Sequence, residues 1–112
     1  MQAADRLQQI SSDPERMRAV ATETLRRMAV QVRQADLSVD DRAVCLSVLR
    51  TGSDAVVFSY GEPETAQTFL LAAAFGAALA VAQILEGGHD TELLAGIKTI
   101  GAQLAKRGAS LP

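Results

Sequence analysis

The most reactive side chains in this 112-residue chain belong to its one cysteine, Cys45, and its one histidine, His89. A cysteine nucleophile needs a base within hydrogen-bonding distance, and a zinc ion needs three or four sulfur, imidazole or carboxylate ligands. Cys45 stands between Val44 and Leu46 in an apolar segment, whereas His89 follows two glycines much later in the chain. We therefore interpret Cys45 as a buried thiol and His89 as a loop residue, and we expect no catalytic residue, metal site or cofactor.

Two acidic pairs, Asp40-Asp41 and Glu62 with Glu64, resemble the paired carboxylates of some enzymes, but each precedes an apolar segment. Carboxylates in the first turn of a helix are stabilised by the positive end of the helix dipole. Gly87-Gly88 follows a predicted helix rather than a strand, and it lacks the lysine that completes a phosphate-binding loop. These motifs indicate helix ends, and the sequence predicts a protein that is not an enzyme.

The segment that must organise the chain runs from Thr65 to Leu85 and contains no charged residue. Pro63 suits the first position of a helix, and Gly87 suits its end. At ~100° per residue, apolar side chains cover the whole circumference of this helix, so we expect it to be buried on every side, in a membrane or in protein. Its flanks are acidic rather than basic, which favours a buried helix of a soluble protein over a membrane span. The single cysteine cannot form an internal disulfide and the N-terminus has no signal-peptide pattern, so we expect a cytoplasmic protein.

Three further segments have the periodicity of amphipathic helices. The first begins at Ser12-Asp13-Pro14-Glu15, which fits either a capping box or an Asp cap followed by Pro at the first position. The second begins after Ser38 and the third after Asp90. Thr51-Gly52-Ser53-Asp54 is expected to break or bend the second helix. Residues 55–60 are interpreted as helix, although their β-branched residues also favour a strand.

These segments predict an all-α fold, in which residues 1–112 form a single domain built as a small antiparallel bundle of about four helices. Residues 1–12 are expected to be a short amphipathic turn or a flexible arm. The 11 basic and 13 acidic residues nearly cancel, and the segment Glu62-Pro63-Glu64 that would lead a DNA-recognition helix is acidic. The sequence therefore predicts no direct contact with nucleic acid.

Three amphipathic helices of one chain would not cover the whole circumference of the central helix, so we expect a second subunit to complete the core. Ala72, Gly76 and Ala80, spaced by four, form a strip of small residues that allows two helix backbones to approach closely. We interpret this strip as the contact of a homodimer, with a neighbouring helix of the same chain as the alternative.

Binding of another protein is the function class that the remaining apolar residues favour. The large side chains expected to contact such a partner are Phe58, Tyr60, Phe69, Phe75 and Leu79.

In length, all-helical layout and the uncharged helix PETAQTFLLAAAFGAALAVAQIL, the chain resembles the small helical QslA-like antiactivators of quorum sensing. The resemblance implies a cytoplasmic dimer that sequesters a LuxR-type transcription factor through its ligand-binding domain and blocks DNA binding. It implies no cofactor and no direct DNA contact, and it transfers no binding residue to a position of this chain. The same apolar helices would also serve a chaperone or assembly factor for a secreted or multi-subunit complex. The partner recovered from the native host distinguishes the two.

Overall fold

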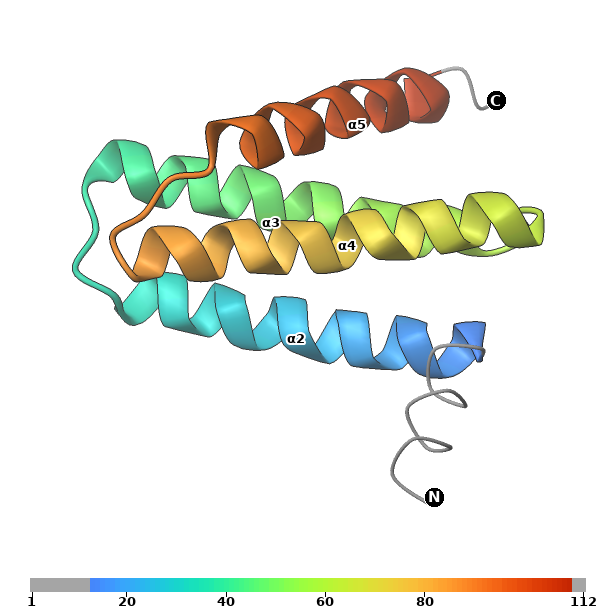
Figure 1. The fold of residues 1–112 in the computed structure, drawn as a ribbon, viewed down its shortest axis with the longest axis horizontal. Coiled ribbons are helices and arrows are strands. Elements are labelled where there is room, and N and C mark those ends of the chain that lie inside the picture. Colours follow the sequence, from blue (N-terminus) through green and yellow to red (C-terminus); the bar gives the residue numbers. More distant parts are fainter. Residues whose placement is uncertain (1–12, 110–112) are drawn as a thin grey trace.

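The computed structural model describes residues 13–109, which form four α-helices with no strand among them (Figure 1). They are α2 (Pro14–Gln34), α3 (Val39–Ser59), α4 (Glu64–Leu85) and α5 (Thr91–Ala109). Successive helices run in opposite directions, so the predicted all-α antiparallel bundle is confirmed. The expected turn or arm at residues 1–12 lies outside the described residues.

Short polar side chains begin three of the helices, as the sequence indicates. The Asp13 carboxylate accepts hydrogen bonds from the backbone N–H groups of Glu15 and Arg16, at 3.1 and 3.3 Å, so Asp13 rather than Ser12 caps α2. Ser38 accepts from the backbone of α3 at 3.1 Å, and Asp90 accepts from the backbone of α5 at 3.0 Å. Each cap satisfies backbone donors that a helix cannot pair internally.

Gly87 ends α4, as predicted, because its backbone lies in the left-handed region with φ of 93°. Side chains other than glycine rarely adopt this conformation, which turns the chain out of a helix. The Gly88 N–H then donates to the Gln83 carbonyl at 2.8 Å and satisfies an acceptor of the last turn. Pro63, expected at the first helical position of α4, lies one residue earlier, at the cap.

A side chain of α3 stabilises the α2–α3 connection by hydrogen bonding. The Arg42 guanidinium donates to the backbone carbonyl groups of Val32, Arg33 and Ala35 at the C-terminal end of α2. These carbonyl groups have no partner within the helix and carry the negative end of its dipole, so a cation stabilises them.

The predicted break at Thr51-Gly52-Ser53-Asp54 is wrong, because α3 continues through these residues to Ser59. Glycine here serves close packing. A Cβ atom on Gly52 would lie 2.9 Å from Cδ2 of Leu25 and 3.0 Å from Cβ of Ala77. The missing side chain therefore lets α2 and α4 approach α3 at one level, and the helical interpretation of residues 55–60 is confirmed up to Ser59.

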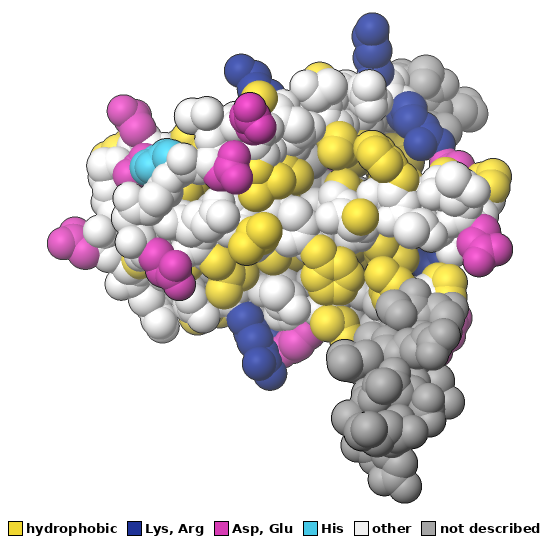
Figure 2. Space-filling model, in the orientation of Figure 1, with side chains coloured by type: hydrophobic (Ala, Val, Ile, Leu, Met, Phe, Trp, Pro, Cys, Tyr) yellow, Lys and Arg dark blue, Asp and Glu magenta, His cyan; other side chains and the backbone are white. Residues whose placement is uncertain are grey.

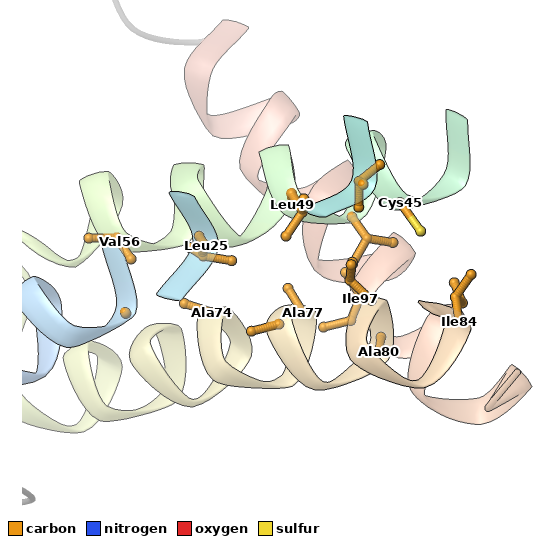
Figure 3. Close-up of a cluster of buried hydrophobic side chains, with 14 of the residues drawn as sticks. Leu25, Cys45, Leu49, Val56, Ala74, Ala77, Ala80, Ile84 and Ile97 are labelled. Carbon is orange, nitrogen blue, oxygen red and sulfur yellow. The ribbon is translucent and has the colours of Figure 1, made fainter. Parts of the chain in front are cut away.

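The core lies mainly between α3 and α4, which share the largest interface between helices. Ala74, Ala77 and Ile84 of α4 face Cys45 and Leu49 of α3 (Figure 3). Both α2 and α5 pack against this central pair, whereas the two outer helices have no packed contact with one another in the described part of the chain. The consequence is that α4 is covered by α3 beneath and by α2 and α5 on its flanks.

Cys45 is completely buried, as predicted, and the pKa of its thiol is raised. Burial raises the pKa of the thiol, the Asp41 carboxylate raises the same pKa, and the Arg42 guanidinium lowers it. Because the pKa of the Cys45 thiol is higher in the folded state, the protonated thiol contributes to the free energy of unfolding. This contribution is complete below the pKa of the unfolded thiol and is lost as pH rises through the pKa of the folded thiol.

We expect native Cys45 to react with Ellman's reagent at pH 8 at least about tenfold more slowly than the urea-unfolded chain, because the buried thiol is protonated and enclosed. Above about pH 9, the free energy of unfolding is expected to fall more steeply for the natural chain than for Cys45→Ala. Urea titrations from pH 7 to 10.5 measure this difference. Equal slopes for the two proteins would show that Cys45 ionises equally in both states.

Candidate protein-binding surface

The outer side of α4 exposes large apolar side chains. Phe69 keeps 58% and Leu79 keeps 54% of its surface exposed, Ala72 is exposed between them, and Phe75 is half-buried beside them. We call these four residues the α4 face. Figure 2 shows hydrophobic side chains gathered across the middle of the surface over α4. Within one chain, α2, α3 and α5 therefore leave the outer side of α4 uncovered, and burial of that side stays a prediction that requires a second subunit or a partner.

The predicted dimer strip does not lie on one surface. Ala72 is exposed, Gly76 is half-buried and Ala80 is only 1% exposed, within the core. A Cβ atom on Gly76 would lie 3.6 Å from Ile97 and 3.7 Å from Leu93, so this glycine faces α5 of the same chain. Each step of four residues turns ~40° around a helix. The strip thus rotates from the outer side towards α5, and Ala80 offers no surface to a second subunit.

Phe58 and Tyr60 lie apart from the α4 face. Phe58 is half-buried in a second apolar cluster between α3, α4 and α5, with the Arg107 guanidinium 5.3 Å from its ring centroid. Tyr60 is 63% exposed in the α3–α4 connection, where the Arg18 guanidinium lies 4.3 Å from its ring centroid. Of the five residues predicted to contact a partner, the structure brings Phe69, Phe75 and Leu79 together.

A groove of about 1030 Å³ runs between α3 and α5 and was not predicted. Its lining includes small residues such as Ala43, Ser47 and Ala102, with Arg50, Asp54 and Lys98 also contributing. The two helices approach closely at one level, where a Cβ atom on Gly101 would lie 2.7 Å from Oγ1 of Thr51. A glycine in the middle of α5 is the sequence signal for this contact, but the groove beside it depends on how the two helices cross.

The residues considered for chemistry do not form a site. His89 lies 3.3 Å from an Asp41 carboxylate oxygen, and both side chains are substantially exposed. Cys45 is enclosed in the core. Among residues 13–109, no group of three or more His, Cys, Asp or Glu side chains is arranged to hold a metal ion.

One helix of the described chain, α4, has the length and composition to cross a membrane. Half of the residues in its most apolar window are buried inside the protein. The same window supplies the exposed residues of the α4 face.

No protein-family model, curated protein or solved structure matches this chain. The functional argument therefore rests on the surfaces described above.

Proposed function

We propose that this chain is a non-enzymatic regulatory protein that acts by binding another protein through the α4 face. The observation that carries this proposal is the exposure of Phe69 and Leu79 on a helix whose 21 residues from Thr65 to Leu85 include no charge. At ~1.5 Å per residue these two side chains lie about 15 Å apart along the helix, which is two turns or more of a partner helix. A contiguous exposed apolar patch on a soluble protein is typical of an interaction site.

The resemblance to antiactivators makes the proposal specific. In that version, the partner is a LuxR-type transcription factor in the cytoplasm, and its sequestration prevents DNA binding. A homodimer belongs to the same proposal: a second copy covers Phe69 and Leu79 in the free protein, and the partner replaces it. Such competition makes the dimer the resting form and the complex the active one.

The decisive experiment is affinity capture from host lysate with three proteins. They are the natural chain, Leu79→Glu on the α4 face, and Val57→Glu as a control at another exposed apolar position, 65% exposed on α3. We expect Leu79→Glu to reduce capture at least about tenfold, because it places a charge in an apolar interface, and Val57→Glu to capture normally. Circular dichroism verifies that both variants keep their helices.

Equal capture by all three proteins would contradict binding through the α4 face. Recovery of a secreted protein or of an unassembled subunit, in place of a transcription factor, would support the chaperone alternative. Light scattering of the free proteins tests the dimer. We expect the natural chain to be dimeric and the Leu79→Glu variant to contain more monomer.

A further inference from the structure

Arg18 of α2 is a charged side chain buried among neutral groups. Arg18 is only 7% exposed and lies where α2 meets the end of α3 and the start of α4. Its Nε donates to Oγ of Ser59 at 2.9 Å, and its Nη2 donates to Oε1 of Gln67 at 3.1 Å. The aromatic ring of Tyr60 stacks on the guanidinium at 4.3 Å. These contacts hold the guanidinium in one orientation.

The described residues provide no counter-charge for this cation. None of their carboxylates forms an ion pair with Arg18, and the nearby Glu62 is paired with Arg107 instead. Guanidinium stays protonated in proteins, and a buried charge without a counterion is strongly unfavourable. Ser59 Oγ also donates to the Val56 carbonyl, and Gln67 Nε2 donates to the Glu62 carbonyl, so both side chains are held in position while their oxygens accept from Arg18.

One nitrogen of Arg18 is available to a ligand. Nη1 forms no hydrogen bond with the described residues. It is also not among the enclosed unpaired atoms of that part of the chain, where Gln83 Oε1 is the one found. The two N–H groups of Nη1 thus have no acceptor among the described residues, on a guanidinium that packs against the exposed ring of Tyr60.

We propose that Arg18 and Tyr60 form the binding site for a carboxylate on the protein partner, with an apolar residue of the same partner segment packing on the Tyr60 ring. This inference rests on the proposed function and names the partner's chemistry. A carboxylate carries one charge and matches one guanidinium. A phosphate dianion is disfavoured, because Glu62 lies in the same connection as Tyr60 and Glu64 is the first residue of α4.

Sodium acetate, a carboxylate alone, is the probe for the test. Two-dimensional NMR follows the Nε–H signal of Arg18 and the ring signals of Tyr60 while acetate is added at constant ionic strength, with sodium chloride as the reference salt. We expect a saturable shift of both signals, with half-saturation at roughly 10–100 mM acetate, and no saturation with chloride. Inorganic phosphate is expected to bind more weakly than acetate.

Two variants and a control complete the design. Arg18→Met removes the charge, and Arg18→Lys keeps it but loses the planar fork, so both are expected to lose the saturable response at Tyr60. Arg50→Met, at an exposed arginine of α3, is expected to respond as the natural chain does. In the capture experiment, Arg18→Met is expected to reduce the partner recovered about tenfold.

A linear response to acetate, an unchanged response in Arg18→Met, or tighter binding of phosphate would each overturn the carboxylate site. Asp5 is the one carboxylate in the sequence of residues 1–12. A response to acetate that emerges only in Asp5→Asn would show that Asp5 is the counterion of Arg18, and would also overturn the proposal. Failure of the proposed function is separate: capture would then be insensitive to Leu79→Glu. Failure of this inference alone would leave capture sensitive to Leu79→Glu and insensitive to Arg18→Met.

Discussion

Leu71→Ala is expected to lower the free energy of unfolding by about 3–4 kcal/mol. Leu71 is 1% exposed and is among the largest fully buried side chains, on the side of α4 that faces the core. Removing three carbon atoms from such a position loses their transfer free energy and leaves a cavity. In a domain whose total stability is typically ~5–15 kcal/mol, this loss is a large fraction.

The matched control is Leu79→Ala, the same change about two turns later, where the side chain points ~80° further around α4 and faces outward. Leu79 is 54% exposed, so the loss is expected to be less than about 1 kcal/mol. Urea denaturation followed by circular dichroism measures both values. Similar losses at the two positions would mean that Leu79 is as well covered as Leu71, which would remove the α4 face as a candidate binding surface.

Gly52→Val is expected to cost about 3 kcal/mol or more. Its Cβ atom would overlap Cδ2 of Leu25 at 2.9 Å and Cβ of Ala77 at 3.0 Å, and the two additional methyl groups would meet the same neighbours. The Leu25 side chain can rotate, but the Ala77 contact yields only if α3 and α4 separate. Overpacking of this kind displaces helices and typically costs 1–3 kcal/mol, and occasionally more.

Gly96→Val in α5 is the control for this prediction, because no atom lies within 4 Å of a Cβ atom added there. Valine has a higher helix propensity than glycine, so this variant is expected to be neutral or stabilised by a few tenths of a kcal/mol. Thermal and urea unfolding of the two variants compare them directly. A Gly52→Val protein as stable as the natural chain would contradict close packing of α2 and α4 against Gly52.

The helix ends could be predicted because they depend on neighbours in the sequence. The Asp13, Ser38 and Asp90 caps each bond to backbone groups two or three residues away, and Gly87 adopts its left-handed conformation to end α4. Interactions of this range are present in any fold that contains the helix. The same locality explains why the all-α class and the buried Cys45 were predicted.

The errors concern residues whose role depends on distant partners. The segment around Gly52 has the composition of a helix break. In the structure, Gly52 lies inside a continuous helix and packs closely against Leu25 and Ala77. Arg18 belongs to a helix with many exposed arginines, and only the ends of α3 and α4 bury it beneath Tyr60. Its spacing of three and seven residues from Ala21 and Leu25 places Arg18 on the buried stripe of α2, but nothing local to α2 indicates Ser59, Gln67 or Tyr60 as its partners.

For the candidate binding surface, the sequence by itself determined that α4 is apolar on all sides and that Phe69, Phe75 and Leu79 belong to it. The tertiary structure decided which of these side chains remain exposed, because exposure depends on where α2, α3 and α5 pack around α4. It also directed Gly76 and Ala80 towards α5 and the core rather than outwards. Hydrophobic burial has no direction of its own, so a helix with apolar residues all round buries whichever side its neighbours cover.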